Sequence, residues 1–233
     1  MKILLVAATQ AEIEPLLSRL GNSNNPKQLI VKDFTVDVLV TGVGMVATAF
    51  AIGRHLALNQ YELAINAGIA GSFDFTIALG EVVLVNEDIF AEQGAEDGEG
   101  FLSLKELGFG ENSQLPVDFK NSGQLAGTSL QSSDASIYRP VYFKSLDKLK
   151  HVKAITVNKV HGHELTISKT LSRVKAQVES MEGAAFFYAC NQSKTPCLQI
   201  RAISNYVERR DKEKWDIGLA VKNLNDQLVN LLI

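Results

Sequence analysis

Cysteine is scarce in this sequence, and long apolar runs are absent. Two cysteines among 233 residues, Cys190 and Cys197, are too few for a disulfide framework and indicate reduced thiols. No apolar run approaches the roughly 20 residues that a membrane-spanning helix needs. The first run, Ile3–Ala8, is too short for a signal peptide, and Glu12 and Glu14 follow closely. We therefore expect a cytoplasmic protein with no membrane partner.

An excess of charge of one sign is also missing. The chain carries 23 Lys and Arg against 26 Asp and Glu, a net charge of −3, without a long basic run. It lacks the electrostatic footprint of a nucleic-acid-binding protein, so we expect no nucleic-acid partner. Apolar residues make up 46% and charged residues 21%, which excludes disordered and fibrous classes. A small anionic substrate is compatible with this balance, since local charge need not follow net charge.

Short apolar runs alternate with amphipathic segments along the chain. The runs predict strands at Lys2–Ala8, Gln28–Val31, Phe34–Val40, Tyr61–Asn66, Gly80–Asn86, Lys153–Val157 and Leu198–Ile203. Helices are predicted at Ala11–Leu20, Met45–Leu58, Gly183–Cys190 and Trp215–Leu232. Loops with short elements are expected at Glu92–Gly100 and Gly108–Gln131. The alternation predicts a three-layer α/β fold, and without a repeat or linker we expect residues 1–233 to form one domain.

Two glycine-rich segments follow predicted strands. Thr41–Ala47 fits the loose Gly-x-Gly-x-x-Ala pattern of a dinucleotide site. It does not lie on the first βα unit, and the next strand ends in Asn66 instead of an acid, so a tight turn near another ligand is favoured over a nicotinamide site. Asn66–Gly71 predicts a second glycine turn, at a strand end where open α/β sheets bind ligands. A bare connector is the alternative interpretation of that turn.

Acidic side chains stand where two helices are predicted to begin. Glu12 lies just past the first strand, where it could cap the helix or act as a general base. Glu179 and Glu182 precede a helix of small residues, where acids usually complement the helix dipole. Arg201–Asn205 ends a strand with polar residues that can reach base edges or hydroxyls.

Metal-ligand spacing is not found. His161 and His163 lack a matching cluster of carboxylates or thiolates. The acidic stretch Glu96–Glu99 lacks the alternating ligands and closing Glu of a calcium loop. We expect no metal.

Five segments, taken together and in this order, resemble the nucleoside phosphorylase and nucleosidase superfamily: Lys2–Ala8 followed by Glu12, Thr41–Gly44, Asn66–Gly71, Ser180–Gly183 and Arg201–Asn205. The resemblance covers most of the chain. It implies a single α/β domain whose mixed, partly closed sheet is flanked by helices. It also implies a nucleoside as small-molecule substrate, a homo-oligomer, and no cofactor.

Within that superfamily the chain most resembles the futalosine hydrolase family. Three stretches carry the closer match: Gln93–Leu104, Thr156–Asn158 with His161 and Gly162, and Ser204–Glu208 with Arg210, Asp211 and Trp215. The reaction implied is hydrolysis of the N-glycosidic bond of futalosine, which gives hypoxanthine and dehypoxanthinyl futalosine.

The resemblance implies a role for three residues in catalysis. Glu12 would orient and deprotonate the attacking water, and Glu182 would accept hydrogen bonds from the ribose hydroxyls. Asn205 stands where adenine-specific nucleosidases have an aspartate. Its amide nitrogen can donate to N7 and O6 of hypoxanthine, which are both acceptors. The sequence therefore indicates a 6-oxopurine substrate.

The resemblance also implies residues that bind substrate or support the site. Met181, Ala70 and Gly71 would line the sugar and base region, and Trp215 would cover the base. His161 and Gly162 would form the wall of the base pocket, and Ser204 would support the base-binding loop. Arg201 would hold Glu182 or neighbouring backbone.

Other functions compete with this interpretation. A phosphorylase of the same fold would want arginines for its phosphate dianion, but Ala8–Glu14 offers two carboxylates and no arginine. An adenine-specific nucleosidase acting on methylthioadenosine or adenosylhomocysteine is a second alternative. A non-catalytic nucleoside sensor is a third, and would not need a water-activating base. The distal carboxylate of futalosine could meet Arg139, Arg209, Arg210 or a residue of a partner subunit.

Overall fold

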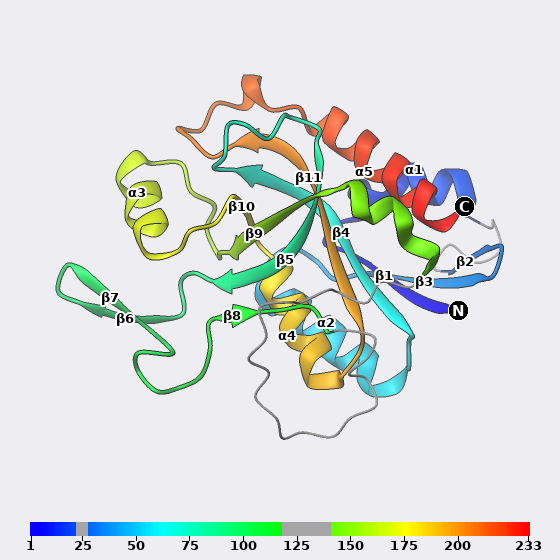
Figure 1. Cartoon of the computed structure of the whole chain (residues 1–233), viewed down its shortest axis with the longest axis horizontal. Helices are drawn as coiled ribbons and strands as arrows, with labels where there is room; N and C mark the ends of the chain where they lie inside the picture. The colour runs from blue at the N-terminus through cyan, green and yellow to red at the C-terminus, as the bar shows by residue number, and fades with distance from the viewer. Residues whose placement is uncertain (22–27, 118–140) are drawn as a thin grey trace.

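A mixed sheet of nine strands runs through the described part of the chain (Figure 1). The structure is a computed structural model that describes residues 1–21, 28–117 and 141–233. The strands follow the order β10-β9-β5-β11-β4-β1-β3-β2, and β8 pairs with β5. Their bounds are β1 (Lys2–Ala7), β2 (Gln28–Val31), β3 (Phe34–Val40), β4 (Leu63–Ser72), β5 (Val82–Phe90), β8 (Ser113–Gln114), β9 (Lys150–Thr156), β10 (Val178–Ser180) and β11 (Cys197–Tyr206).

The sheet closes on itself at β10. This strand pairs in parallel with β9 and antiparallel with β4, where Val178 lies opposite Ser72 and Glu179 opposite Gly71. Strands β4, β11, β5, β9 and β10 therefore form a closed ring, while β1, β3 and β2 extend it as an open sheet. The expected mixed, partly closed sheet is confirmed. Since Asn205 of β11 also lies opposite Gly71, the closure brings the ends of three strands together.

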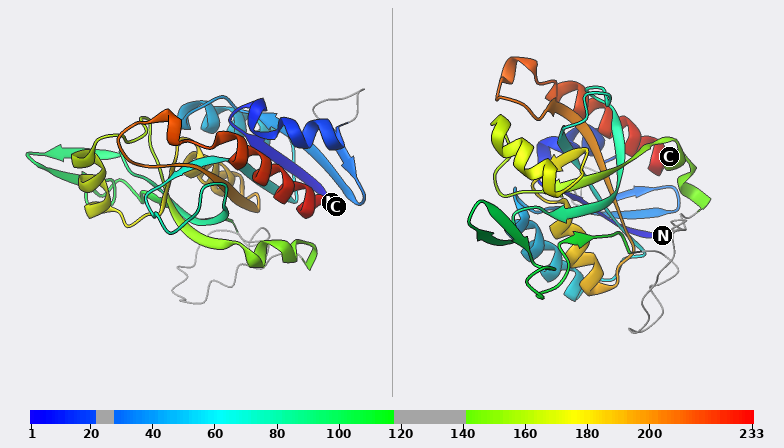
Figure 2. Two further views of the ribbon diagram at one scale, coloured as in Figure 1. Left: turned by 90° about the horizontal axis from the view of Figure 1, so that it is seen from above. Right: turned by 60° about the vertical axis from the view of Figure 1, so that its left-hand side comes forward.

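Helices cover both faces of the sheet (Figures 1 and 2). One face carries α1 (Gln10–Leu20) and α5 (Ile217–Leu232), and the other carries α2 (Met45–Leu58) and α4 (Gly183–Ser193). Ile3 and Leu5 of β1 pack in the core under α1 and α5, whereas Leu4 and Val6 pack toward α2 and α4. Because both faces of β1 are buried, the strand is apolar almost throughout. The three-layer prediction is confirmed.

Asn225 of α5 joins the two helices of the first face. Pro15 lies inside α1, and a proline ring there disturbs the regular helical hydrogen bonds. Two backbone groups of α1 find a partner in Asn225 instead: its amide nitrogen donates to the carbonyl of Glu12 (2.8 Å), and its amide oxygen accepts from the N–H of Leu16 (2.9 Å). The backbone of Glu12 is thereby fixed to α5.

Residues 66–71 differ most from the sequence prediction. β4 continues through them, paired with β11, so the predicted glycine turn is wrong. The small residues make room for neighbours: a Cβ on Gly68 would overlap Nη1 of Arg201 and lie 2.8 Å from Oε1 of Glu12. A Cβ on Gly71 would lie 3.1 Å from Nδ2 of Asn205. Close side-chain approach, not chain reversal, accounts for these glycines.

The other glycine segment does form the tight strand-to-helix turn. It links β3 to α2, and Gly42 and Gly44 have positive φ angles of 87° and 96°. Residues other than glycine rarely adopt such backbone angles. The turn brings Val43 to the cavity described below.

Several elements were not predicted from the sequence. Helix α3 (Glu164–Arg173) is mostly polar, with Leu165 68% exposed and Thr170 as its buried residue, and β10 is too short to show a period. The expected loop Glu92–Gly100 contributes to a hairpin of β6 (Gly94–Asp97) and β7 (Gly100–Ser103). Of the expected loop Gly108–Gln131, residues 118–131 lie outside the described residues.

Replacing Gly68 by Ala tests the close approach at β4. We expect Gly68→Ala to lower the free energy of unfolding by about 2–3 kcal/mol, because the added Cβ overlaps the buried guanidinium of Arg201. Urea unfolding measures the change. In the matched control Gly53→Ala, on α2, the new Cβ meets nothing within 4 Å. The control should gain about 0.5–1 kcal/mol from helix propensity. A Gly68→Ala variant as stable as the native protein would contradict this account.

Candidate functional site

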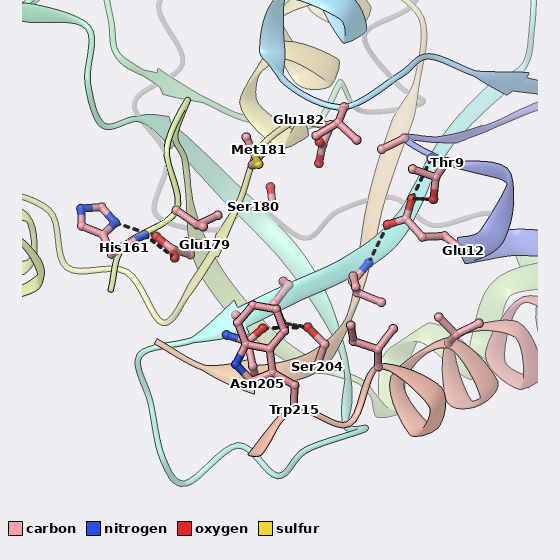
Figure 3. A pocket seen from close by; sticks show the side chains of 18 of the residues that line it. Thr9, Glu12, His161, Glu179, Ser180, Met181, Glu182, Ser204, Asn205 and Trp215 are labelled. Atoms are coloured by element: carbon pink, nitrogen blue, oxygen red, sulfur yellow. Dashed lines mark hydrogen bonds and ion pairs between the residues drawn. The ribbon is translucent and has the colours of Figure 1, made fainter. Parts of the chain in front are cut away.

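The converging ends of β4, β10 and β11, together with the start of α1, bound a cavity of about 380 Å³ (Figure 3). Most residues singled out from the sequence line it: Glu12, Ala70, Gly71, His161, Met181, Glu182, Ser204, Asn205 and Trp215. Two do not. Arg201 is 1% exposed and lies behind the wall, and Gly162 is not among the lining residues. Segments far apart in the sequence therefore meet around one space.

Glu12 stands at the start of α1 with its carboxylate in the cavity wall. Its Oε2 accepts hydrogen bonds from the backbone N–H (2.9 Å) and hydroxyl (3.0 Å) of Thr9, and its Oε1 accepts from the N–H of Ile69 (3.1 Å). Glu12 thus caps the helix and also lines the cavity, so both interpretations from the sequence fit its position. A carboxylate has about four lone-pair positions, and three are occupied here. One remains for a ligand or water.

Glu182 is held from two sides at the start of α4. Its Oε1 accepts a hydrogen bond from the N–H of Gly44 (3.0 Å), in the turn before α2. Its Oε2 lies 3.9 Å from Nη1 of Arg201, which is buried beneath it. Glu182 as a whole is 6% exposed, and it lines the cavity. This arrangement leaves acceptor capacity on Glu182 for hydroxyl groups of a ligand.

A chain of buried polar side chains supports Arg201. Its Nε donates to Gln199 (2.9 Å), its Nη2 donates to Asn66, and Gln199 in turn donates to Asp88 (3.0 Å). Asp88 also accepts from the hydroxyl of Thr156 (2.8 Å). Burial raises the pKa of Asp88 to about 6, although its hydrogen bonds and the charge of Arg201 act in the opposite direction.

Asn205 faces the cavity at the end of β11. Its Oδ1 lies 2.9 Å from the hydroxyl of Ser204, and its Nδ2 donates to the carbonyl of Tyr206 (3.0 Å). The Ser204 hydroxyl also lies 3.2 Å from the carbonyl of Ala70. One hydrogen of the Asn205 amide is therefore used internally. The other is available to a ligand, so the side chain offers one donor in this conformation, not two.

His161 is engaged on both ring nitrogens. Nδ1 lies 2.6 Å from Oε2 of Glu179, and Nε2 lies 2.9 Å from the hydroxyl of Thr170 on α3. The N–H of His161 donates to the same glutamate (3.0 Å). The ring is therefore a wall of the cavity, with no nitrogen left over in this arrangement. Glu179 was interpreted from the sequence as a helix-start acid, but it anchors this wall.

Trp215 forms another wall, and the guanidinium of Arg210 lies 4.6 Å from its ring centroid. Arg210 lines the cavity, whereas Arg209, the second arginine considered for the distal carboxylate, does not. Arg139 lies outside the described residues. The sequence analysis missed further lining residues, among them Thr9, Val43, Ile69, Val160 and Ser180. Val43, Ile69 and Ser180 lie within segments that the sequence analysis singled out without naming these residues, and Val160 is next to His161. Thr9 lies three residues before Glu12, the spacing of a capping box, and that spacing is the signal that could have found it.

Neither a metal-binding cluster nor a membrane-spanning helix is found in residues 1–21, 28–117 and 141–233. No group of three or more His, Cys, Asp or Glu side chains there could hold a metal ion. In the same residues, no helix has both the length and the apolar character needed to cross a membrane.

Comparison with protein families identifies the class of protein. The model of the Phosphorylase superfamily matches residues 2–232. The chain belongs to this superfamily, in agreement with the resemblance of its motifs.

Individual relatives narrow the comparison. The chain is 32% identical to the futalosine hydrolase of Thermus thermophilus over 198 residues, 83% of this chain and 80% of the relative. It is 24% identical to the 5′-methylthioadenosine/S-adenosylhomocysteine nucleosidase of Colwellia psychrerythraea, over 100% of this chain and 96% of the relative. The solved structure of a futalosine hydrolase of Helicobacter pylori has the same fold. Its TM-score is 0.75 at 13% identity, over 99% of this chain and 97% of that one.

The titration of Asp88 gives a pH-dependence that stability measurements can check. A carboxyl whose pKa is higher in the folded than in the unfolded protein binds more protons when folded, so stability falls as the pH rises between the two pKa values. For Asp88 this window runs from about 4 to about 6.

We therefore compare the native protein with Asp88→Asn. Between pH 4 and pH 7 the native protein should lose roughly 3 kcal/mol more of its free energy of unfolding than the variant does. Urea unfolding at several pH values measures both curves. Any constant offset that the amide introduces does not affect this comparison, and parallel curves would refute the assigned titration.

Proposed function

We propose that this chain is a futalosine hydrolase. It cleaves the N-glycosidic bond of futalosine with water and releases hypoxanthine and dehypoxanthinyl futalosine, a step of an alternative route to menaquinone. The observation that carries the proposal is the position of the Glu12 carboxylate, which faces the same cavity as the Asn205 amide. The 32% identity to a futalosine hydrolase supports the choice of substrate. The proposal takes residues 1–233 as one nucleosidase domain of a cytoplasmic homo-oligomer.

The attacking water would be bound by Glu12. Its carboxylate is held rigidly by Thr9 and Ile69 and keeps one lone-pair position for the water. As the water oxygen bonds to C1′ of the ribose, its proton passes to Glu12. The bond from C1′ to the purine nitrogen breaks, and its electron pair leaves with the base. The purine anion takes up a proton from solvent and Glu12 gives its proton back to solvent, so the reaction balances and the carboxylate is restored.

The sugar would lie against Glu182 and Met181. The ribose gains positive charge as the base departs, and hydrogen bonds from its hydroxyls to the Glu182 carboxylate strengthen at that point. Gly44 and Arg201 hold this carboxylate in place from behind. The leaving purine would lie near Asn205, whose free amide hydrogen stabilises the charge that develops on it.

Phosphorolysis is the closest alternative, and the charge around the cavity disfavours it. The lining contains the carboxylates of Glu12, Glu179, Glu182 and Glu208 against one guanidinium, that of Arg210. A phosphate dianion needs arginines and backbone donors. Glu12, at the place proposed for the nucleophile, would repel phosphate but suits a neutral water molecule. The charge distribution therefore supports hydrolysis.

The assay of this function measures free base. Purified protein is incubated with futalosine or with methylthioadenosine, each with and without phosphate, and the released hypoxanthine or adenine is quantified. We expect hypoxanthine from futalosine, at a rate that does not depend on phosphate. Sugar phosphate as the product would establish a phosphorylase, and adenine release as the faster reaction would establish an adenine-specific nucleosidase.

Replacing Glu12 tests the general base. Glu12→Gln should lower kcat about 10²–10⁴-fold, because an amide cannot take the proton of water. Its amide group would also face a backbone N–H of Thr9 or Ile69, so circular dichroism and thermal unfolding must confirm the fold. Glu14→Gln is the matched control, since Glu14 is exposed on the same helix and accepts hydrogen bonds from Gln10 and Ser18. A kcat of Glu12→Gln within threefold of the native value would contradict the assignment.

Replacing Asn205 tests selection of the base. Hypoxanthine has acceptors at N7 and O6. Adenine carries an amino group at C6, and the amide N–H of Asn205 cannot bond to it because both groups are donors. Asn205→Asp should shift preference from futalosine toward adenine nucleosides by some 1–3 kcal/mol, the cost of leaving one group unpaired at a desolvated site. The ratio of kcat/KM values for matched hypoxanthine and adenine nucleosides measures it. Equal efficiency of the native protein on the matched pair would sink the assignment.

A further inference from the structure

Asp88 of β5 carries a buried carboxyl that the proposed mechanism does not use. Its Oδ1 accepts a hydrogen bond from the hydroxyl of Thr156 (2.8 Å), and its Oδ2 accepts one from the amide nitrogen of Gln199 (3.0 Å). The residue is 0% exposed and is not among those that line the cavity. A carboxylate withdrawn from water depends on such hydrogen bonds. Both of these bonds lead to the start of α4, where Glu182 stands.

The first connection runs through Thr156 to the backbone of α4. The N–H of Ala184, in the first turn of this helix, donates to Oγ1 of Thr156 (2.7 Å). Such an N–H has no acceptor within its own helix. Since the hydroxyl oxygen accepts from Ala184, the hydroxyl hydrogen is left for the carboxylate of Asp88. Asp88 and Thr156 thus fix the helix two residues after Glu182.

The second connection runs through Gln199 to Arg201. A guanidinium only donates hydrogen bonds, and an ionised carboxylate only accepts them. Gln199 lies between the two: its amide nitrogen donates to Asp88, and its amide oxygen accepts from Nε of Arg201 (2.9 Å). One orientation of the amide alone satisfies both neighbours. Arg201 in turn places Nη1 3.9 Å from Oε2 of Glu182. The acceptor at Asp88 therefore sets the order of donors and acceptors as far as the counter-charge of Glu182.

We infer that Asp88 is a positioning residue for Glu182: it holds the backbone and the counter-charge of the carboxylate that binds the ribose hydroxyls, and so makes the reaction selective for ribonucleosides over 2′-deoxynucleosides. This inference rests on the proposed function. Glu182 touches the sugar from the cavity wall (Figure 3), whereas Asp88 acts from behind that wall.

The chemistry of the pair Asp88 and Gln199 suggests the first variant, Asp88→Asn. Two side chains donate to residue 88, and an asparagine has only one acceptor oxygen. With the oxygen toward Thr156, the new amide nitrogen faces the amide nitrogen of Gln199. If Gln199 turns over to meet it, two donors face each other at Arg201 instead. Either way the support of Glu182 is broken without a change of volume.

The test compares kcat/KM for futalosine and for 2′-deoxyfutalosine at pH 8, where Asp88, with a pKa of about 6, is ionised. The missing hydroxyl changes the intrinsic reactivity of the substrate equally for every variant, so this effect cancels when ratios are compared. Asp88→Asn should lower the ribo-to-deoxy ratio about tenfold, mainly through kcat, the effect of one hydrogen bond to a charged group. A residue that only stabilises the fold would change the free energy of unfolding and leave this ratio unmoved.

A double variant tests the order of donors and acceptors directly. Asp88→Asn combined with Gln199→Glu moves the negative charge by one side chain. The new glutamate can accept from Arg201 and from the new amide nitrogen, while the amide oxygen accepts from Thr156. We expect the double variant to return the ribo-to-deoxy ratio to within about threefold of the native value.

The Thr156 connection has its own pair of variants. Thr156→Val keeps the volume but removes the hydroxyl, so it should lower the ratio, whereas Thr156→Ser keeps the hydroxyl and should preserve it. Asp37→Asn is the matched control for the change of charge. Asp37 of β3 also accepts from two side chains, Gln28 (2.6 Å) and Tyr61 (2.8 Å), and does not line the cavity. Its variant should keep the native ratio.

The outcomes separate the inference from the proposed function. An Asp88→Asn ratio equal to the native one overturns the inference, whatever the stability of the variant, and so does a folded double variant whose ratio stays low. If Asp88→Asn does not fold, Thr156→Val decides, and an unchanged ratio there overturns the inference. If the native protein releases no hypoxanthine from futalosine, the proposed function fails and the inference fails with it. Hypoxanthine release with a ratio that these variants leave unmoved refutes the inference alone.

Discussion

The buried guanidinium of Arg201 is the constraint on which the site depends. A charge that is 1% exposed is tolerated only if hydrogen bonds and opposite charge surround it. Arg201 meets this need with Gln199 of its own strand, Asn66 of β4 and Glu182 at the start of α4. Asp88 of β5 completes the set through Gln199. The arginine therefore fixes how four elements meet, and it orients the carboxylate that faces the cavity.

Burying these ions explains the glycines around them. Gly68 lets Arg201 and Glu12 approach across β4, and a Cβ on Gly183 would overlap both Asp88 and Gln199. A side chain at either position would force the polar groups apart and leave the charge unpaired. Glycine costs conformational entropy in regular structure, so its place within β4 reflects a packing need. The backbone of the site is therefore shaped from behind, by groups that no substrate touches.

The predictability of each element follows from how local its cause is. β2, β3 and α2 have the bounds that the sequence predicts, because their apolar spacing is complete within the segment. The first part of β4 was predicted as a strand, but its second part was mistaken for a turn because its glycines serve contacts with β11 and α1, which lie far away in the sequence. Glu12 and Glu182 could be singled out since they flank helix starts in recognisable motifs. Glu179 was noted beside Glu182, but its role could not be predicted, because it depends on His161, which the closed sheet brings near.

The carboxylates of the cavity differ in what holds them, and this difference separates their roles. Glu182 lies beside Arg201, Glu179 contacts the His161 ring, and Glu208 lies 3.4 Å from Lys214. Glu12 forms no ion pair within 4.0 Å with a residue in the described ranges, and its hydrogen-bond donors there are the neutral groups of Thr9 and Ile69. The Arg201 guanidinium approaches Glu12 across Gly68 but forms no ion pair with it within 4.0 Å, so the remaining lone pair of Glu12 stays open to a ligand. A group that must take a proton from water needs this kind of support, whereas a group that must only bind hydroxyls benefits from a fixed counter-charge. The fold thus provides two carboxylates of the same type with different surroundings, and it is the surroundings that suit one to water and the other to sugar.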